Sequence, residues 1–308
     1  MSRSVVDKIS ELRARRKAVV LAHNYQPPEV QDLADFCGDS LGLSVQASRT
    51  QAEVIVFCGV RFMAETAAIL CPDKVVLLPD PEAGCPMADM ITAAQLRQLK
   101  AQHPGAIVVC YVNSTAEVKA ESDTCCTSAN AVDLVRSLPK DRQIVFVPDQ
   151  NLGQYTAEQT GRDLVLWPGY CRSHVLITED DIRAAKARCP DAVVMVHPEC
   201  TEAVRGLADQ VLSTGQMLRF VRQSRAKRFI VGTEIGILHA LNKENPDAQY
   251  IPASDRAVCP NMKRITLDKV LWALEDMQVQ VTIPKDIAAQ ARKSLQRMTE
   301  VVPSYAKG

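Results

Sequence analysis

The chain has 308 residues, enough for about two domains of ordinary size and compatible with one to three. Its 36 basic and 36 acidic side chains give a formal net charge of zero. This balance argues against nucleic acid or a membrane surface as the main partner, because proteins that bind either of them usually carry an excess of basic side chains. Apolar residues make up 47% of the chain, as in a globular protein with a sizeable core, and no apolar run approaches the ~20 residues of a membrane helix.

The beginning of the chain and its cysteines indicate a cellular compartment. Residues 1–16 are charged and helix-like, without the apolar stretch of a signal peptide. Eleven cysteines without an export signal indicate reduced thiols, some of them metal ligands, and not a disulfide framework. We therefore expect a cytoplasmic protein.

A pattern of an apolar run followed by a polar cluster occurs three times. The runs begin at Ala18, Ala106 and Ala192, at steps of 88 and 86 residues. Three Ile-Thr pairs that open predicted helices recur at similar steps, with their threonines at positions 92, 178 and 266. The chain is therefore interpreted as a threefold repeat of about 87 residues.

In chain order, each copy predicts alternating strands and helices. Buried strands are expected at 18–22, 54–60 and 74–80, then at 106–110, 143–149 and 163–169, and then at 192–196, 229–234 and 249–254. Helices with a threonine cap are expected at 91–102, 177–188 and 265–277, and a last strand at 279–284 precedes a final helix.

This alternation predicts an α/β fold of three pseudo-threefold-related α/β/α sandwich units, each with a small parallel sheet, around a central active site. The expected units are residues 1–85, completed by the C-terminal segment 260–308, then 86–171 and 172–259.

Polar residues occupy equivalent positions just beyond the first strand of each copy. Ligands of α/β sheets bind beyond the carboxyl ends of the strands, so a threefold arrangement would gather these residues in one cavity. Helix capping does not explain them, because His, Tyr, Asn and Glu are not interchangeable as caps. The two equivalent sets are His23, Tyr111 and His197, and Tyr25, Asn113 and Glu199.

Three hydroxyl residues, Ser40, Ser128 and Thr214, keep the same steps of 88 and 86 residues. They precede or open later elements, where a hydroxyl and helix N-terminal amides suit a phosphate or a carboxylate. Hydroxyl residues are also ordinary helix caps. Both interpretations remain open from the sequence.

Three cysteines, Cys85, Cys171 and Cys259, follow the last strand of each copy in loops with Pro or Gly. Three converging thiolates are a soft ligand set for zinc or an iron–sulfur cluster. A structural zinc site normally has four ligands and often Cys-x-x-Cys pairs, which this chain lacks. A 4Fe–4S cluster on three cysteines leaves one iron free to act as a Lewis acid. Cys58, Cys110 and Cys189 lie in or beside apolar stretches and are interpreted as core residues.

Long motifs extend across nearly the whole chain. They are HNYQPPEVQDLADFCGDSLGLS, FCGVRFMAETAAIL, YVNSTAEVKAESDTCCTSANA, PDQNLG, VHPEC, VGTEIG and CPNMK. Together they resemble the quinolinate synthase family of de novo NAD biosynthesis. The resemblance implies condensation of iminoaspartate (iminosuccinate) with dihydroxyacetone phosphate to quinolinate, phosphate and water. It also implies one 4Fe–4S cluster per chain, with Cys85, Cys171 and Cys259 as its ligands, and a transient contact with the L-aspartate oxidase or dehydrogenase that supplies iminoaspartate.

The resemblance also implies roles for individual residues. The family motif gives Tyr25 and His174 as catalytic helpers. We assign Glu199 as the main general base, with Tyr25, Tyr111 and His197 as groups that carry protons or orient the reactants. Substrate contacts are expected from His23, Ser40, Tyr111, Asn113, Ser128, His197, Glu199, Ser213 and Thr214.

The chain departs from the family pattern at the third cysteine. Some family members carry Cys-x-x-Cys at the third ligand as a redox switch, whereas Cys259 is followed by Pro260, Asn261 and Met262, so that switch is not expected here.

Two alternative functions would place different demands on the protein. A cluster-dependent hydro-lyase acting on a hydroxy acid would need no phosphate pocket. An iron–sulfur sensor would need an output surface such as a basic patch, which the balanced charge does not predict.

Overall fold

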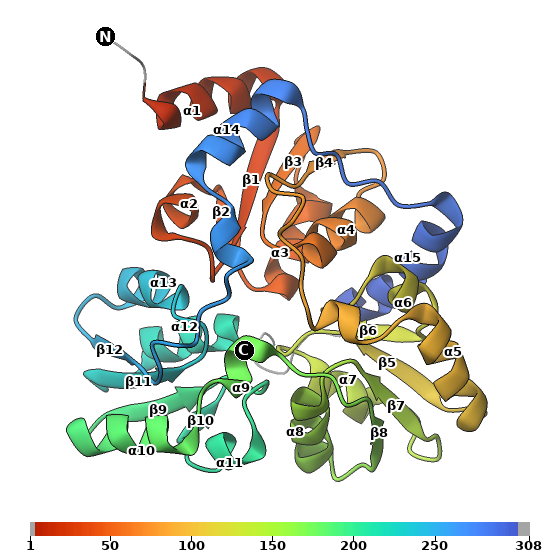
Figure 1. Cartoon of the computed structure of the whole chain (residues 1–308), viewed down its shortest axis with the longest axis vertical. Helices are drawn as coiled ribbons and strands as arrows, with labels where there is room; N and C mark the ends of the chain where they lie inside the picture. The colour runs from red at the N-terminus through yellow and green to blue at the C-terminus, as the bar shows by residue number, and fades with distance from the viewer. Residues whose placement is uncertain (1–3, 301–308) are drawn as a thin grey trace.

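The computed structural model describes residues 4–300, and three four-stranded sheets form its framework (Figure 1). The strand orders are β2-β1-β3-β4, β6-β5-β7-β8 and β10-β9-β11-β12, and every strand pair within these sheets is parallel. Helices flank the sheets, and the three units surround the centre of the molecule in Figure 1. The predicted fold class is confirmed.

The strands are short and consist mainly of buried apolar residues, as expected of parallel strands covered by helices. Their bounds are β1 (Ala18–His23), β2 (Phe36–Gly38), β3 (Val54–Cys58), β4 (Val75–Leu77), β5 (Ile107–Tyr111), β6 (Thr124–Cys126), β7 (Ile144–Val147), β8 (Leu164–Leu166), β9 (Val193–Val196), β10 (Gln210–Val211), β11 (Arg228–Gly232) and β12 (Gln249–Pro252).

The α-helices lie between the strands and after the last sheet. Their bounds are α1 (Val5–Arg16), α2 (Pro28–Leu33), α3 (Ser40–Arg49), α4 (Arg61–Leu70), α5 (Ala93–Gln102), α6 (Ala116–Ala120), α7 (Ala131–Ser137), α8 (Gln150–Thr160), α9 (Arg172–Val175), α10 (Glu179–Arg188), α11 (Glu202–Arg205), α12 (Thr214–Gln223), α13 (Ile237–Glu244), α14 (Leu267–Asp276) and α15 (Lys285–Glu300). Two 3₁₀ turns, η1 (Ala88–Met90) and η2 (Met262–Arg264), complete the described structure.

The predicted threonine caps are confirmed. Thr92, Thr178 and Thr266 are the N-caps of α5, α10 and α14, and each hydroxyl accepts a backbone N–H from the residue three positions later. A cap of this kind satisfies one of the amides that a helix start leaves without an intrahelical partner. The Ile-Thr signal therefore marks a true helix start in each copy.

Two parts of the sequence prediction differ from the structure. The edge strands β2, β6 and β10, of two or three residues each, were not predicted. The strand expected at 279–284 is wrong: the segment forms one isolated antiparallel bridge, between Gln280 and Leu77, and Val281 N–H donates to Val76 O at 2.9 Å. Its backbone therefore lies beside β4 without forming a ladder.

The segment after the third sheet contacts two units. Helix α14 packs against α1, and α15 packs against α4, α6 and β6. We keep the division at 1–85 with 260–308, 86–171 and 172–259 as a proposal, with residues 1–3 and 301–308 outside the described residues. The contacts of α14 with α1 support assigning the first part of the C-terminal segment to the first unit, whereas α15 packs mainly against α6 and β6 of the second unit.

The strand order of each sheet indicates where a ligand-binding cavity is expected. In each sheet the order reverses direction between its first and third strands, the point where α/β sheets bind ligands.

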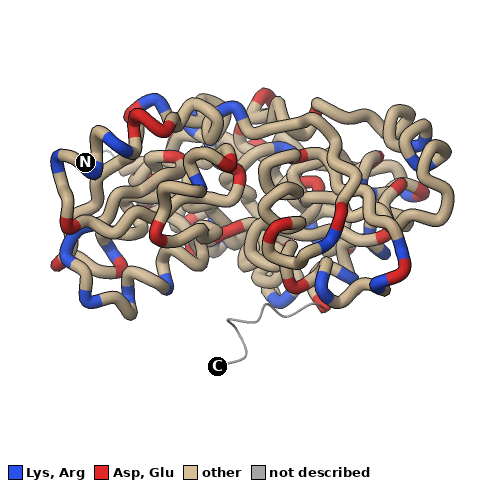
Figure 2. The backbone as a smooth tube through the Cα atoms, turned by 90° about the horizontal axis from the view of Figure 1, so that it is seen from below, with Lys and Arg blue, Asp and Glu red and all other residues tan. Residues whose placement is uncertain are grey.

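Charges of both signs are interspersed along the molecule in Figure 2. Within residues 4–300, no helix combines the length and the apolar character needed to cross a membrane.

Candidate active site

A cavity of about 540 Å³ lies between the three units. All but one of the residues predicted for the site line it. They are His23, Tyr25, Ser40, Cys85, Tyr111, Asn113, Ser128, Cys171, His174, His197, Glu199, Thr214 and Cys259. The exception is Ser213, which is buried and caps α12 by accepting the N–H of Gln216.

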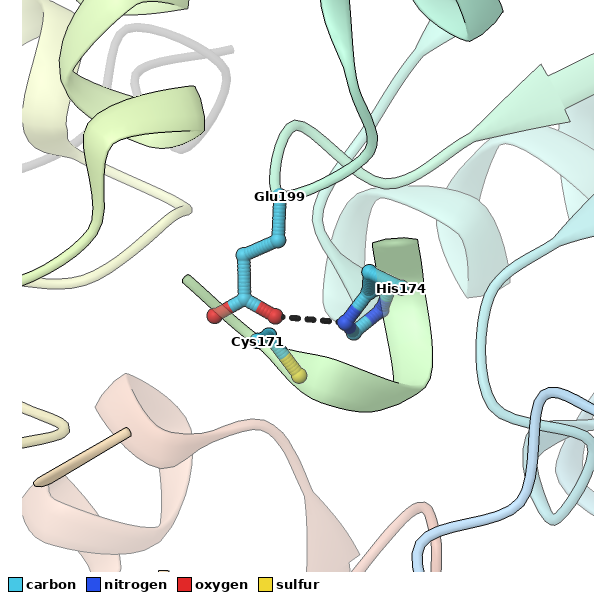
Figure 3. Close-up of side chains that lie close together, drawn as sticks. All are labelled: Cys171, His174 and Glu199. Atoms are coloured by element: carbon cyan, nitrogen blue, oxygen red, sulfur yellow. Dashed lines mark ion pairs between the residues drawn. The ribbon is translucent and has the colours of Figure 1, made fainter. Parts of the chain in front are cut away.

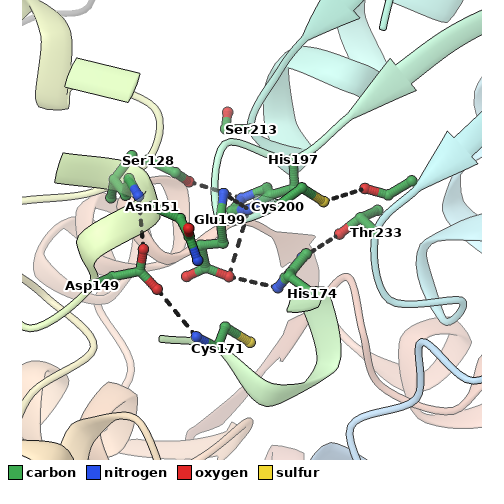
Figure 4. A network of polar contacts seen from close by, with 12 residues as sticks. Ser128, Asp149, Asn151, Cys171, His174, His197, Glu199, Cys200, Ser213 and Thr233 are labelled. Carbon is green, nitrogen blue, oxygen red and sulfur yellow. Dashed lines mark hydrogen bonds and ion pairs between the residues drawn. The ribbon is translucent and has the colours of Figure 1, made fainter. Parts of the chain in front are cut away.

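A buried polar network begins at Glu199, in the loop after β9 (Figure 4). Its Oε2 lies 2.7 Å from Nδ1 of His174 and 3.5 Å from Nδ1 of His197. Nε2 of His174 lies 2.8 Å from the hydroxyl of Thr233, which lies 2.6 Å from the hydroxyl of Tyr25. These contacts form a continuous path for protons between Glu199 and Tyr25.

Two histidines sit in the same local turn in different units. The N–H of Tyr25 donates to Nδ1 of His23 at 3.2 Å, and the N–H of Glu199 donates to Nδ1 of His197 at 3.3 Å. Because Nδ1 accepts in each case, the neutral ring carries its proton on Nε2. Nε2 of His197 then donates to the hydroxyl of Ser128 at 3.2 Å.

Burial keeps both of these rings neutral. It lowers the pKa of His23 to about 3 and that of His197 to about 3, against the opposing effect of the Glu199 charge. At neutral pH each ring is therefore an N–H donor without charge. Such a donor suits a substrate carboxylate or carbonyl oxygen.

Glu199 and the two tyrosines hold opposite protonation states. Burial favours the neutral acid, but His174, His197 and a hydrogen bond from Tyr111 together lower the pKa of Glu199 to about 2. Burial and the charge of Glu199 raise the pKa of Tyr25 and of Tyr111 well above the ordinary value. At neutral pH Glu199 is therefore an ionised carboxylate, and both phenols keep their protons.

The three repeat-related cysteines share one local geometry. Each thiol accepts a backbone N–H from the residue three positions later, namely Ala88, His174 or Met262. In two copies that residue lies in a 3₁₀ turn, and in the third it lies in α9. Each sulfur therefore lies at the start of a short helical turn, and Figure 3 shows Cys171 there beside Glu199 and His174.

The donor chemistry fits a metal–sulfur cluster. Burial raises the pKa of Cys85 to about 12 and that of Cys171 well above the ordinary value, and it also raises the pKa of Cys259. Cys259 adds to the shift at Cys85, and Cys85 adds to the shift at Cys171, so the sulfurs are close enough to repel one another as thiolates. A bound cationic metal would offset both effects.

Two buried acids that the sequence analysis missed hold these cysteine loops. Asp149 accepts the N–H of Cys171 at 3.1 Å, and Glu234 accepts the N–H of Cys259 at 3.1 Å. Both follow the third strand of their sheet, β7 and β11, at an offset of 85 residues. They lie inside the PDQNLG and VGTEIG motifs, so the repeat spacing could have revealed them.

Glu234 also connects the first and third units. It pairs with Lys263 at 2.9 Å, and the Lys263 ammonium donates to the backbone carbonyl of Tyr25 at 2.5 Å. At Gly236, an added Cβ would lie 2.5 Å from Nζ of Lys263 and 2.7 Å from the Tyr25 carbonyl. Only glycine therefore leaves room for this contact.

Two of the three hydroxyl residues lie at helix starts: Ser40 is the first residue of α3 and Thr214 the first of α12. The N-caps of these helices are Asp39 and Ser213, so the capping interpretation is wrong for both hydroxyls. Ser128 lies in the turn between β6 and α7. The carboxylate of Asp39 lies between these helix starts, where it accepts the N–H of Gly42 at 2.8 Å and receives the backbone N–H of Gly215. Asp39 lines the cavity and is a further residue that the sequence analysis missed.

Comparison with known proteins agrees across the whole chain. The sequence model of one family, described as "Quinolinate synthetase A protein", matches residues 7–300. A protein of Dehalococcoides mccartyi named quinolinate synthase is 58% identical over 295 residues, covering 96% of this chain and 97% of its own. Proteins of the same name from Geobacter metallireducens and Methanosarcina barkeri are 54% and 50% identical, covering 97% and 96% of this chain and 98% and 97% of their own.

Proposed function

We propose that this chain, which belongs to the quinolinate synthetase A protein family, condenses iminoaspartate with dihydroxyacetone phosphate to give quinolinate, phosphate and water. The observation that carries this proposal is the meeting of three repeat-related cysteine thiols and the Glu199 network at one cavity. The cysteines suit a cluster, and the network suits the proton transfers of ring formation.

In this proposal Cys85, Cys171 and Cys259 hold a 4Fe–4S cluster. When bound, the cluster supplies an iron with an open position that acts as a Lewis acid on a substrate oxygen. Asp149 and Glu234 fix the backbone of two of the three ligands. Such supporting hydrogen bonds orient metal ligands and tune the site.

The cavity offers neutral donors for anionic substrates. Iminoaspartate carries two carboxylates and dihydroxyacetone phosphate carries a phosphate. The Nε2–H groups of His23 and His197 and the hydroxyls of Ser40 and Thr214 can hold these groups. Asn113 adds a buried Oδ1 that has no hydrogen-bond partner among the described residues and is free to accept from a substrate.

Proton movement is assigned to the buried network. Phosphate loss, carbon–carbon bond formation, imine formation and dehydration each require proton transfer. Glu199 Oε1 has no hydrogen-bond partner within residues 4–300 and is placed to take a proton, while Oε2 is held by Nδ1 of His174. Tyr111 and Tyr25 retain their hydroxyl protons and can donate them, with Thr233 connecting Tyr25 to His174.

The chain's surroundings follow from the same proposal. We propose a cytoplasmic location, supported by its free cysteines, and small-molecule substrates as its main partners. We also propose a transient contact with the oxidase or dehydrogenase that makes iminoaspartate, because a reactive imine benefits from short transfer.

The test is anaerobic purification with iron and sulfide analysis, followed by an assay of quinolinate formation from both substrates. We expect about four irons per chain, and Cys85→Ser, Cys171→Ser and Cys259→Ser should each lose the cluster absorbance and the activity. Cys58→Ala, Cys110→Ala and Cys189→Ala are the matched controls and should keep both. A cluster-free preparation that forms quinolinate at the full rate would refute the proposal, and a loaded enzyme that leaves dihydroxyacetone phosphate unconsumed would favour a hydro-lyase.

A further inference from the structure

We propose that the cluster-free chain binds one zinc-type divalent cation at Cys171, His174 and Glu199, and that this cation and the cluster exclude each other because both use Cys171. The exclusion rests on the proposed function, whereas the cation site itself does not. The site differs from the three-cysteine set, since it shares a single cysteine with it.

Three ligand atoms of different chemistry converge at this point. The sulfur of Cys171, a ring nitrogen of His174 and a carboxylate oxygen of Glu199 all lie within 4.8 Å of one another (Figure 3). Cys171 is the N-cap of α9 and His174 lies three residues later in it, so one helical turn presents both side chains to the same side. Glu199 approaches from the loop after β9.

One carboxylate oxygen at this point is buried without the hydrogen bond that buried polar groups usually have. The Glu199 side chain is 3% exposed, and its Oε1 has no hydrogen-bond partner in the described part of the chain. The His174 side chain is 2% exposed, and its Nδ1 faces the Glu199 carboxylate at 2.7 Å. A cation bound here would give Oε1 a partner and would replace the contact between Nδ1 and Oε2.

The opposite side of the histidine is already fixed. Nε2 of His174 lies 2.8 Å from the hydroxyl of Thr233. A metal-binding histidine typically has such a hydrogen bond on its other nitrogen, which orients the ring. Thr233 therefore holds His174 in the orientation that a metal on Nδ1 requires.

The ligand set matches zinc better than magnesium or calcium. Sulfur, nitrogen and carboxylate oxygen bind zinc at about 2.0–2.3 Å, which places ligand atoms about 3.3–3.6 Å apart in a tetrahedron. Zinc binding therefore requires Nδ1 of His174 and the Glu199 carboxylate to move apart from their present 2.7 Å. Thiolate and carboxylate balance the double positive charge, and magnesium and calcium prefer oxygen ligands alone. The fourth position would face the cavity.

The experiment uses the full-length chain after removal of iron by a chelator. Zinc affinity is measured by competition with a chromophoric chelator, and Co²⁺ is used as a spectroscopic substitute for zinc. We expect one cation per chain with the absorption of a single thiolate–Co²⁺ bond. Cys171→Ser and His174→Gln should each weaken zinc binding by more than about tenfold, and Glu199→Gln provides a second test of the non-cysteine ligands.

The matched controls are Cys85→Ser and Cys259→Ser, which should keep zinc affinity unchanged although they lose the cluster. If these two variants weaken zinc as strongly as Cys171→Ser, zinc binds to the three cysteines and the inference is wrong. It is also wrong if none of the variants alters the affinity. These outcomes are independent of the proposed function, which iron analysis and quinolinate formation test separately.

Mutual exclusion has its own measurement. Zinc-loaded wild type should fail to take up iron and sulfide during anaerobic reconstitution, whereas His174→Gln treated with the same zinc should take them up. Equal cluster uptake by zinc-loaded and zinc-free wild type would overturn the exclusion. Iron and sulfide per chain are the readout, so the result does not depend on activity.

Discussion

At the residue scale, the chemistry of the cavity depends on how burial sets protonation. Glu199 is 3% exposed yet keeps a pKa of about 2, because His174, His197 and Tyr111 outweigh the cost of burying its charge. His23 and His197, buried to a similar degree, have lowered pKa values and stay neutral. Side chains that are buried to a similar degree therefore differ in charge state, because the groups around them differ.

Glu199→Gln tests the role of the carboxylate. Gln keeps the size of the side chain and its hydrogen bonds but cannot take a proton, so we expect turnover to fall by about 10²-fold or more. Iron content should stay at the wild-type level, because no proposed cluster ligand changes. Glu202→Gln, on the exposed face of α11, is the control and should leave turnover unaltered. Near-normal quinolinate formation by Glu199→Gln would shift the role of base to Tyr25 and His197.

The neutral histidines predict a pH dependence of stability. The folded pKa of His23 is about 3 and its ordinary value is 6.5, so between these values the unfolded chain binds a proton that the folded chain does not. Stability must therefore fall as pH decreases from 6.5 toward 3, by up to about 1.4 kcal/mol per pH unit for this group. His23→Asn should reduce that slope, as measured by urea unfolding from pH 6.5 to 4.5.

His197→Asn should reduce the same slope, because burial lowers the pKa of His197 to about 3 as well. If both variants keep the wild-type slope, these rings are protonated in the folded chain and do not act as neutral donors.

At the element scale, the loops after the last strand of each unit differ in how they are supported. Asp149 holds the Cys171 loop and Glu234 holds the Cys259 loop, whereas Val60 occupies the equivalent position in the first unit. Lys263 balances Glu234 and also reaches the Tyr25 carbonyl. The third loop is therefore fastened to the first unit as well as to its own sheet.

Gly236→Ala tests this connection. The added methyl would meet Nζ of Lys263 at 2.5 Å, Oε2 of Glu234 and the Tyr25 carbonyl each at 2.7 Å, so the contact must open. We expect a loss of about 1–3 kcal/mol in unfolding free energy and a lower iron content after reconstitution. Gly206→Ala is the control, since its Cβ would meet its nearest atom at 3.5 Å, an ordinary contact. Unchanged stability and iron content in Gly236→Ala would remove this role from the Glu234–Lys263 pair.

At the scale of the whole molecule, α15 connects the first two units. The hydroxyl of Ser294 donates to the carbonyl of Lys119 in α6 at 2.9 Å, and Arg292 donates to the carbonyl of Ile69 in α4 at 2.9 Å. Leu295 and Met298, in the same helix, are fully buried. The cavity lies between the units, so α15 supports the site without lining it.

Leu295→Ala should lower the unfolding free energy by about 2–5 kcal/mol, because it removes a fully buried side chain and leaves a cavity. Denaturant unfolding measures the change, and Gln296→Ala, on the exposed face of the same helix, should shift it by less than about 0.5 kcal/mol. A loss of less than about 0.5 kcal/mol in Leu295→Ala as well would mean that packing between units does not set the contribution of α15.

The sequence by itself determined the three α/β units and their central strands. Buried strands rich in Val and Ile, and helices capped at Thr92, Thr178 and Thr266, are local patterns that can be recognised in the sequence without knowledge of the tertiary structure. The repeat steps also selected most of the residues that line the cavity, because equivalent positions of equivalent units meet at one axis.

The tertiary structure alone decided what depends on distant partners. The edge strands β2, β6 and β10 form only because a neighbouring strand offers its backbone, and the segment at 279–284 stays irregular although its composition favours a strand. Asp149 and Glu234 look like turn residues in sequence, and their role appears only beside Cys171 and Cys259. Lys263 reaches Tyr25 across 238 positions, a contact that no local pattern encodes, because only folding brings the two together.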